Sequence, residues 1–392
     1  MEHQKKNIKI LVVDDEVDLE PLVKQRFRRQ IREGVYEFLF AHNGLEALAK
    51  LIEHPEIGII LSDINMPEMD GLTLLLKLKE LKNPSLKTVI VSAYGDMENI
   101  RTAMNRGAFD FLTKPINFED LEITINKTLE EIRLVRKSQE EHHQLLFIQH
   151  DLETAREIQQ AILPATFPPF PHRKDFDIFA SMQAAREVGG DFYDFFMIDN
   201  DHIGFVIGDV SGKGVPAAIF MAVSRTLIRA TGLKGISVEE CIDYANHLLC
   251  NESTSCMFVT VFYGILDTKT GEISYVNGGH NPPYLIRANG TLEVVPLTGG
   301  TILGFLDDEK FDSAKIHLQP NDTLFLYTDG ITEAFNEEDE AFGEGRLEEL
   351  LRANYHLPIK DLAQDAVTRI QEFCGEAPQS DDITLMAIRY MA

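Results

Sequence analysis

Five polar side chains in the first third of the sequence stand where short apolar runs end. Asp14 and Asp15 follow one run, Asp63 ends a second, Ser92 a third and Lys114 a fourth. Crowded carboxylates repel each other unless a hard cation lies among them, and Mg²⁺ suits such a site because it takes oxygen ligands. One carboxylate can then attack a phosphoryl group while Mg²⁺ and an ammonium neutralise the transferring oxygens. These residues predict phosphoryl transfer to an aspartate, with a nearby hydroxyl that can act as a switch.

The segments that must position these groups alternate between short apolar runs and amphipathic stretches. Such alternation favours βαβ units, with a parallel sheet and helices on both faces. In such sheets the functional groups gather at the carboxyl ends of the strands. We therefore predict a doubly wound, five-stranded parallel (flavodoxin-like) α/β domain with five helices over residues 1–125. Its strands are expected near Ile8–Val13, Phe38–Ala41, Ile57–Leu61, Thr88–Val91 and Phe109–Leu112.

With these groups in this order, residues 6–125 resemble the CheY-like receiver family. The resemblance implies that Asp63, in the run Asp63-Ile64-Asn65-Met66-Pro67, is the phosphoacceptor. It also implies one Mg²⁺ and a sensor histidine kinase or phosphotransfer protein as phosphoryl donor. Asp14, Asp15, Asp63 and the Asn65 carbonyl would bind the Mg²⁺ ion. Ser92 would sense the phosphoryl group and Lys114 would pair with it. The resemblance also implies a cis Lys114–Pro115 bond and an aromatic switch at Phe111.

Two other interpretations of these residues stay open. Asp14 and Asp15 could be turn or N-cap residues without chemistry. The domain could also be a receiver that binds a partner but is no longer phosphorylated. Serine at position 92, where many receivers have threonine, keeps the hydroxyl group and is a mild departure from the pattern.

A second set of aspartates lies in the C-terminal half, again at the ends of strand-like runs. Asp191 opens one apolar run, Asp209 and Asp329 each close one, and Asp381 with Asp382 comes directly before another. Carboxylates at strand ends can gather around hard or borderline divalent metals. Two metals that share a bridging carboxylate can lower the pKa of a water molecule and present hydroxide in line with a phosphoryl group. This pattern predicts metal-dependent phosphate hydrolysis.

The texture of this half differs from that of the first. Strand-like runs separated by turn residues predominate, with helix-like segments near Pro216–Ala230, Val238–Cys250, Arg346–Ala353 and Lys360–Cys374. Mixed strands and helices of this kind predict an α/β sandwich over residues 166–392. The expected strands include Phe192–Ile198, His202–Gly208, Met257–Leu266, Glu272–Asn277 and Asp322–Thr328.

Residues from about 155 to 392 are similar to the sporulation-type branch of the protein phosphatase 2C (PPM) superfamily. The motifs that carry this similarity are Glu157–Pro164, Asn277–Pro282 and the contexts of the four aspartates. The similarity implies a serine/threonine protein phosphatase with two Mn²⁺ or Mg²⁺ ions. It also implies that the substrate is a phosphorylated anti-sigma-factor antagonist protein.

The similarity assigns metal-binding roles residue by residue. Asp209 would bridge both metals, Asp329 and Asp381 would hold the first, and Asp191 with the Val210 carbonyl would hold the second. For Asp194 and Asp382 a supporting or surface position is the alternative to metal binding. His280, in a Gly-Gly-His-Asn-Pro turn, has either a structural role or a catalytic or substrate-contacting one. Lys213 either attracts phosphate or is a solvated turn lysine.

Residues 126–165 are predicted to form a helical, coiled-coil-like linker. From about Phe118 to Pro164 there is almost no glycine or proline, and apolar residues recur at helical or heptad-like steps, with a polar break at Gln139–His143. One long helix or two are both compatible with this pattern. A homodimer through the linker is expected, and the alternative is a last receiver helix followed by a spacer.

Composition restricts the remaining possibilities. The net charge of −26 disfavours nucleic acid and anionic lipid as partners. The four cysteines include no close Cys-x-x-Cys pair, Met1–Lys6 is polar, and no apolar run approaches the roughly 20 residues of a membrane span. These features favour a cytoplasmic protein without a membrane segment or signal peptide.

Other phosphate chemistries fit less well. A nucleotide-binding loop would need glycine at 207 and serine or threonine at 214, where Ile207 and Gly214 stand. A Gly-x-Ser-x-Gly elbow is missing around Ser211, and Cys241 lies in a helix-like segment without a phosphate loop. The alternative function is a catalytically inactive phosphatase-like domain that binds a partner when the receiver is phosphorylated.

Overall fold

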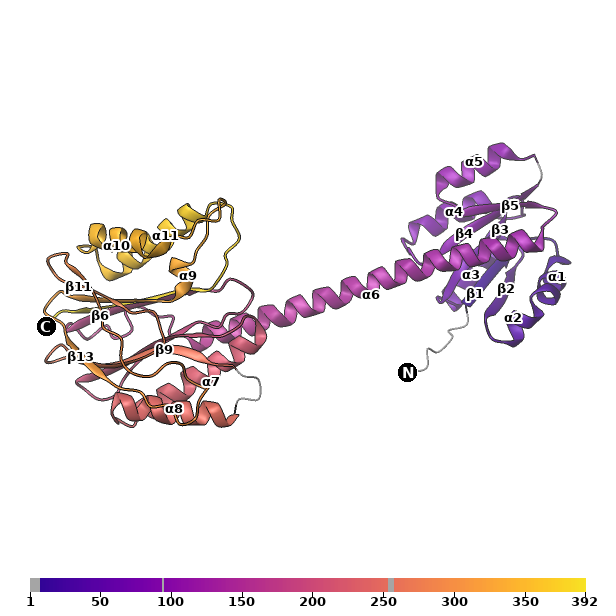
Figure 1. Ribbon diagram of the computed structural model, residues 1–392. Helices are drawn as coiled ribbons and strands as arrows, with labels where there is room; N and C mark the ends of the chain where they lie inside the picture. The colour runs from indigo at the N-terminus through magenta and orange to yellow at the C-terminus, as the bar shows by residue number, and fades with distance from the viewer. Residues whose placement is uncertain (1–7, 94, 253–256) are drawn as a thin grey trace. The chain divides into compact units, whose positions relative to one another are not determined.

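The computed structural model describes residues 8–93, 95–252 and 257–392. The chain divides into two compact units, Met1–Phe147 and Ile148–Ala392 (Figure 1). One helix, α6 (Phe118–Ile162), contributes to both. The predicted boundary at residue 125 therefore lies inside a helix, and the one at residue 165 lies three residues after its end.

The first unit is the doubly wound domain that the sequence predicts. Its five strands are all parallel, in the order β2-β1-β3-β4-β5. Its elements before α6 are β1 (Ile8–Val13), α1 (Leu19–Arg26), α2 (Arg28–Arg32), β2 (Tyr36–Ala41), α3 (Gly44–Glu53), β3 (Ile57–Asp63), α4 (Gly71–Glu80), β4 (Lys87–Ala93), α5 (Met97–Arg106) and β5 (Asp110–Lys114).

Both faces of this sheet are covered, which explains why its strands are apolar runs rather than alternating ones. On one face Val23 of α1 and Leu121 and Ile125 of α6 pack against the strands. On the other face Ala47 of α3 and Leu74 of α4 do the same. The helical segment between β1 and β2 differs from the single helix expected, because it is split in two at Phe27.

Helix α6 runs without interruption, so the polar stretch at Gln139–His143 does not break it. Buried apolar residues lie at its beginning, where Leu129 and Ile132 join the core of the first unit. Leu145 and Ile148, in the middle, are 59% and 54% exposed. Within the described residues, no helix combines the length and the hydropathy that crossing a bilayer requires.

The second unit is a sandwich of two antiparallel sheets, β13-β10-β9-β8-β7 and β12-β11-β14-β15-β6. Its strands are β6 (Phe176–Gln183), β7 (Phe192–Met197), β8 (His202–Val210), β9 (Val259–Asp267), β10 (Glu272–Gly278), β11 (Tyr284–Ile286), β12 (Leu292–Val294), β13 (Ala314–His317), β14 (Thr323–Tyr327) and β15 (Ile383–Tyr390). Its helices are α7 (Val215–Gly232), α8 (Val238–Glu252), α9 (Asp329–Thr332), α10 (Gly343–Asn354) and α11 (Ile359–Cys374).

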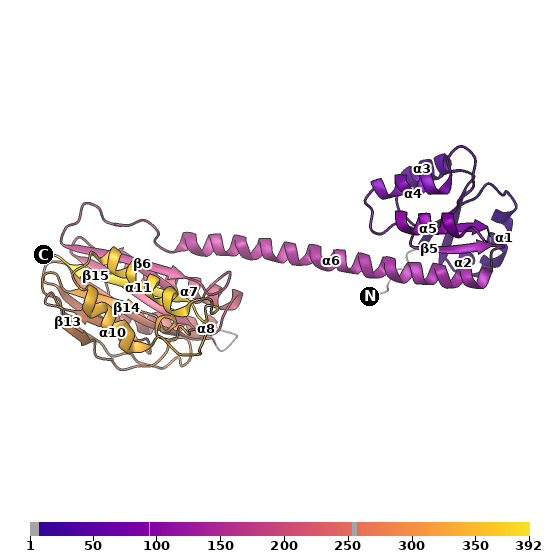
Figure 2. The same cartoon turned by 90° about the horizontal axis from the view of Figure 1, so that it is seen from above.

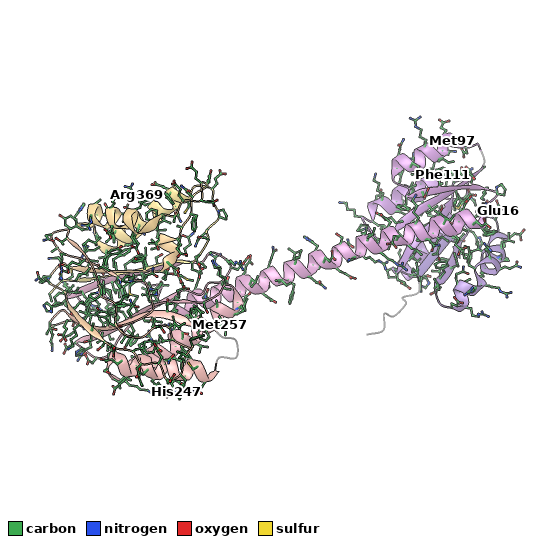
Figure 3. All side chains as sticks on the ribbon, viewed as in Figure 1. Glu16, Met97, Phe111, His247, Met257 and Arg369 are labelled. Atoms are coloured by element: carbon green, nitrogen blue, oxygen red, sulfur yellow. The ribbon has the colours of Figure 1, made fainter. Side chains whose placement is uncertain are left out.

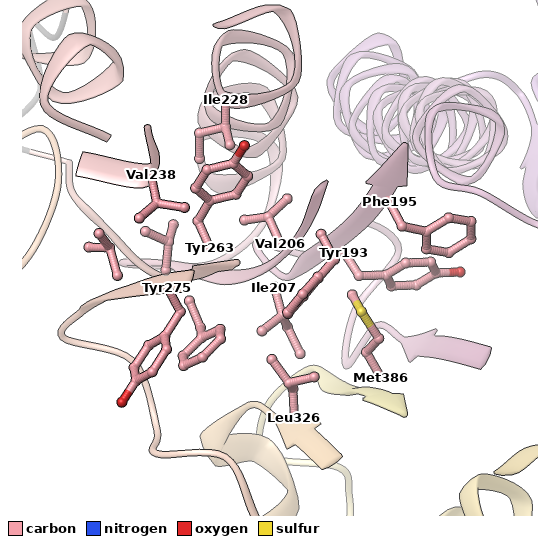
Figure 4. Packing of buried hydrophobic residues seen from close by; sticks show 14 of the residues in the cluster. Tyr193, Phe195, Val206, Ile207, Ile228, Val238, Tyr263, Tyr275, Leu326 and Met386 are labelled. Carbon is pink, nitrogen blue, oxygen red and sulfur yellow. The ribbon is translucent and has the colours of Figure 1, made fainter. Parts of the chain in front are cut away.

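Helices cover the outer faces of the two sheets. Helices α7 and α8 pack on β7–β10, and α10 and α11 pack on the other sheet (Figure 1). Seen from above, α10 and α11 lie in front of the strands (Figure 2). Between the sheets Ile207 of β8 faces Leu326 of β14 and Met386 of β15 within one buried cluster (Figure 4). This packing fixes the ends of β7, β8, β14 and β15 relative to one another, and all four aspartates of the second set lie at those ends.

Candidate functional site

The first unit brings three carboxylates together at the carboxyl edge of its sheet. Asp14 and Asp15 follow β1, and Asp63 ends the neighbouring strand β3. One ligand oxygen from each lies within 4.8 Å of the others. Asp14 and Asp63 are buried, whereas Asp15 is exposed. Within the part of the chain that the structure describes, this is the one acidic group so tightly gathered. The oxygen donors and their spacing fit a single Mg²⁺ ion.

Lys114, at the end of β5, supplies the positive charge of this site. Its Nζ lies 2.7 Å from Asp63 Oδ2, 2.9 Å from Asp14 Oδ2 and 2.9 Å from Glu16 Oε1. Burial alone would lower the pKa of Lys114, but hydrogen bonds to these three carboxylates outweigh it and raise the pKa. Burial also raises the pKa of Asp14. The sequence reasoning missed Glu16, although its position directly after Asp14-Asp15 was a signal.

The loop after β3 holds the Asp63 carboxylate. Asp63 Oδ1 accepts hydrogen bonds from the backbone N–H groups of Ile64 at 2.6 Å and Asn65 at 3.4 Å. Gly71 is required beside it, because a Cβ there would lie 2.0 Å from the Asp63 carbonyl oxygen. These contacts leave Oδ2, which faces Lys114, as the oxygen closest to a positive charge.

The two residues predicted to sense phosphorylation have different surroundings. The Ser92 hydroxyl is buried and donates to Asp96 Oδ2 at 3.3 Å rather than to Asp63. Phe111 is 39% exposed on β5 (Figure 3). The Lys114–Pro115 peptide bond is cis, as the receiver resemblance implies.

The second unit gathers its aspartates from two different sheets. Asp191 comes just before β7, and Asp209 lies near the end of β8, which pairs with β7. Asp329 begins the short helix α9 after β14, and Asp381 precedes β15, which pairs with β14. The sequence indicated the strand ends but not that each sheet provides one pair.

Electrostatic effects show that these carboxylates crowd one another. Burial, together with the charges of Asp209 and Asp382, raises the pKa of Asp191 well above its usual range. Burial and the charge of Asp329 raise the pKa of Asp209 to about 7, and a hydrogen bond with Asp191 offsets part of this. Burial also raises the pKa of Asp329, followed by the charges of Glu333 and Asp381. Such a group is stable in its charged form only with added positive charge.

Glycines allow the backbone to approach these carboxylates closely. A Cβ at Gly330 would lie 1.9 Å from the Asp382 carbonyl oxygen, and one at Gly190 would lie 2.9 Å from the Val210 carbonyl oxygen. The Val210 carbonyl is therefore next to the loop that carries Asp191. Carboxylates and carbonyls are the donors that Mg²⁺ and Mn²⁺ prefer, so the residues present fit divalent metal ions.

Asp382 and Asp194 are both buried and both have clear structural partners. Asp382 Oδ2 accepts from the N–H groups of Gly190 at 2.7 Å and Asp191 at 3.3 Å, so it holds the loop before β7. Asp194 is fully buried and pairs with Arg225 at 2.9 Å and Arg229 at 2.8 Å, both on α7. Of the two roles open for each residue, these contacts support the positioning one.

Two other predicted residues lie close to the aspartates. His280 Nδ1 is 3.0 Å from the Thr260 hydroxyl, and Thr260 is paired with Asp209 across β8 and β9. Burial lowers the pKa of His280 to about 4, so the ring is neutral. The Lys213 ammonium lies 2.8 Å from Asp381 Oδ2. Lys213 is therefore not a freely solvated lysine, because its ammonium forms an ion pair with one of the four aspartates.

Two polar side chains without an assigned role hold the residues around Asp191. Thr328, buried next to Asp329, donates its hydroxyl to Asp191 Oδ2 at 2.8 Å. Gln159, in the last turn of α6, donates to the Gly189 carbonyl at 2.7 Å and accepts from the Gly189 N–H at 3.0 Å. Gln159 lies in the motif Glu157–Pro164, but its partner is 30 residues away, which no spacing rule reveals.

Comparison with known proteins supports the interpretation of both domains. Residues 10–126 match the family model of the response regulator receiver domain, and residues 199–391 match that of stage II sporulation protein E. The chain is therefore a response regulator that has a receiver domain and a second domain of the PP2C phosphatase type. More narrowly, residues 199–391 of that second domain match the model of the stage II sporulation protein E family.

Three relatives illustrate the similarity. Protein IcfG of Synechocystis sp. is 32% identical over 61% of this chain and 41% of its own length. Phosphoserine phosphatase RsbU of Bacillus subtilis is 26% identical over 64% of this chain and 74% of its own length. The solved structure of the RsbU and RsbW domains of Rv1364c from Mycobacterium tuberculosis is 30% identical, with a TM-score of 0.50, over 55% of this chain and 60% of that one. The chain thus spans less than half of IcfG.

Proposed function

We propose that the C-terminal domain hydrolyses phosphoserine or phosphothreonine in a protein, and that phosphorylation of Asp63 controls this hydrolysis. The observation that carries the proposal is that Asp191, Asp209, Asp329 and Asp381 lie at the ends of β7, β8, β14 and β15, where Thr328, next to Asp329, donates its hydroxyl to Asp191 Oδ2 at 2.8 Å. We call these four residues the acidic group. The raised pKa values of Asp191, Asp209 and Asp329, and a set of donors that are all oxygen atoms, suit two divalent cations, Mn²⁺ or Mg²⁺.

In this mechanism the chain's own residues position the reaction. Asp209, whose pKa responds to the neighbouring Asp191 and Asp329, would be shared by both cations. Asp329 and Asp381 would hold the first cation, and Asp191 with the Val210 carbonyl would hold the second. When bound, the two cations supply a water molecule of lowered pKa and neutralise charge on the phosphoryl oxygens. Thr328 and Asp382 hold Asp191 through its carboxylate and its backbone N–H.

In the receiver, Asp63 accepts the phosphoryl group. One oxygen of its carboxylate attacks phosphorus, the bond to the donor's nitrogen or oxygen breaks, and an aspartyl phosphate forms. Lys114, whose Nζ lies 2.7 Å from Oδ2, stabilises the added charge. Asp14 and Asp15, together with the Asn65 carbonyl, would hold a Mg²⁺ ion that neutralises further charge on the phosphoryl oxygens. The Ser92 hydroxyl then turns from Asp96 to the phosphoryl group, and Phe111 moves from its exposed position as the aromatic switch.

The partners follow from the two chemistries and from the relatives. The phosphoryl donor is a sensor histidine kinase or a phosphotransfer protein. The substrate is a phosphorylated protein of the anti-sigma-factor antagonist type, and the relatives named phosphoserine phosphatase RsbU and RsbP support phosphoserine as the target. The strongly acidic chain also suits a protein partner rather than nucleic acid.

Helix α6 is the proposed dimerisation element. Ile148, Leu152, Ala155 and Ile162 follow one another at steps of three, four and seven residues, which favours a coiled-coil seam. An apolar groove of about 490 Å³ between the end of α6 and α7 adds to this surface, with Ile158 and Ile219 60% and 61% exposed. Sedimentation of the full chain should give a dimer, and an Ile148→Asp change should yield the monomer. A wild-type monomer at all concentrations would contradict the seam.

The test of the main proposal is hydrolysis of an aryl phosphate and of a phosphoserine protein by the full chain. Activity should require Mn²⁺ or Mg²⁺, disappear with chelator, and disappear in an Asp209→Asn variant. A phosphodonor should change the wild-type rate and leave an Asp63→Asn variant unchanged. Absence of turnover on both substrates, with metal bound, would instead favour an inactive domain that binds a partner. A response of Asp63→Asn to the phosphodonor would refute control through Asp63.

A further inference from the structure

Lys213 is the one lysine, arginine or histidine that pairs with the acidic group of the second unit in the described part of the chain. Its Nζ contacts Asp381 Oδ2 at 2.8 Å and the Ser380 carbonyl at 2.6 Å. Its charge also acts on Asp329. These are the two carboxylates assigned to the first metal. No basic side chain in the described ranges pairs with Asp191, the residue assigned to the second.

The loop that carries Lys213 is held at both ends and open at its tip. Ser211 exchanges two hydrogen bonds with the backbone of Phe258, at 2.9 and 3.1 Å, and helix α7 begins at Val215. Gly212 and Gly214 have φ of +88° and +77°, which glycine adopts readily. No atom lies within 4 Å of where a Cβ would stand at either glycine. The Lys213 side chain is itself 40% exposed, so solvent is available to it when it leaves Asp381.

We propose that the Lys213 ammonium is an internal counter-ion for the first metal position, held against Asp381 when that position has no divalent cation and displaced when it has one. The physical reason is that carboxylates gathered in a partly buried site need positive charge, and one ammonium supplies part of it. An ammonium and a divalent cation beside the same carboxylate repel each other. This inference rests on the proposed function, because it takes Asp329 and Asp381 as ligands.

The proposal predicts that Lys213 weakens metal binding at one position only. Both partners of the pair are partly exposed, Lys213 at 40% and Asp381 at 35%, so the interaction is screened. Loss of such a pair changes an equilibrium by about two- to fivefold. A Lys213→Gln change should therefore tighten the weaker or the stronger of two Mn²⁺ affinities by about that factor and leave the other unchanged.

Titration calorimetry with Mn²⁺ on the full chain tests this without reference to catalysis. All proteins carry Asp15→Asn, so that binding in the receiver does not contribute. Lys213→Arg keeps the charge and should bind like the parent. Lys269→Gln is the control, because Lys269 also forms an ion pair with an aspartate, Asp201, at 2.6 Å, with side chains 70% and 37% exposed. Circular dichroism checks folding, and Lys213→Met gives a second uncharged side chain if the glutamine variant does not fold.

The outcomes separate this inference from the function on which it rests. Tighter binding in Lys213→Gln or Lys213→Met, but not in Lys213→Arg or Lys269→Gln, supports the counter-ion. Equal or weaker binding in the uncharged variants overturns it and leaves the metal site standing. Absence of Mn²⁺ binding that depends on Asp209 would overturn both the metal site and the counter-ion.

Discussion

The hydrogen bonds between Gln159 and Gly189 connect the last turn of α6 to the loop that carries Asp191. The Gln159 side chain is 6% exposed and satisfies both backbone groups of Gly189, at 2.7 and 3.0 Å. A Gln159→Leu change keeps the approximate size of the side chain and removes both hydrogen bonds. Gly189 would then have a buried N–H and a buried carbonyl without a partner.

The size of the effect follows from these two groups. A buried donor or acceptor left unsatisfied costs about 1–3 kcal/mol. With two such groups, and some relaxation of the loop toward water, we expect local opening at Gly189 to become easier by about 2–4 kcal/mol. Because Asp191 is two residues further along the same loop, the affinity of the metal position that it serves should fall as well.

Hydrogen exchange of the full chain measures this directly. Peptides that include Gly189–Asp191 should lose protection in Gln159→Leu, while peptides from the receiver strands keep theirs, since exchange reports local opening. Gln160→Leu is the matched control, because Gln160 is the exposed neighbour and undergoes the same change. Unchanged protection at Gly189 in Gln159→Leu would refute the argument that this glutamine holds the loop.

Three further predictions concern the acidic group and its supports. With chelator present, thermal unfolding should show the second unit to be less stable near about pH 8 than near about pH 6. The pKa of Asp209 is about 7 in the folded protein, above its usual value, so its contribution to stability is present below the usual pKa and is lost as the pH rises through 7. Greater stability at the higher pH would contradict this. Asp194→Asn should lower the free energy of unfolding by about 3–5 kcal/mol in urea, because Arg225 and Arg229 lose a buried partner, and a change below 1 kcal/mol (roughly the value of an exposed pair) would show that the pair is not effectively buried. Gly330→Ala should lower the melting temperature and metal binding, because its Cβ would stand 1.9 Å from the Asp382 carbonyl oxygen, whereas Gly345→Ala, with no atom within 4 Å, should not.

The strands of the receiver domain were predictable from the sequence to within two residues at each end, for a physical reason. In a parallel sheet with helices on both faces, every strand is an apolar run and every functional group lies where a run ends. The positions of Asp14, Asp63 and Lys114 in the sequence therefore indicated both the strand that each residue follows or ends and the edge of the sheet at which it lies. The break at Phe27 between α1 and α2 had no comparable signal, because no glycine or proline stands between Pro21 and Gly34.

For the second unit, the sequence indicated which residues are functional, but not how its strands are divided between the two sheets. The four aspartates stood out by their strand-end contexts, yet pairing them required knowing that β7 and β8 belong to one sheet and β14 and β15 to the other. Asp194 and Asp382 carried no sequence signal that could separate a ligand from a support. The role of Asp194 depends on its ion pairs with Arg225 and Arg229, which are at least 31 residues away in sequence. The role of Asp382 depends on backbone N–H groups near β7, which belongs to the other sheet.

The supports of the acidic group are unequal, and this has a consequence for regulation. Asp191 depends on α6 through the hydrogen bonds to Gly189. Asp329 begins α9 and Asp381 lies in the loop before β15, and among the described residues no hydrogen bond joins either segment to α6. A change that enters through α6 should therefore alter the metal position of Asp191 first, and Lys213 should alter only the other one. Two separate metal affinities, moved independently by Gln159→Leu and Lys213→Gln, would be the signature of that division; if both variants move the same affinity, the assignment of ligands to the two positions is wrong.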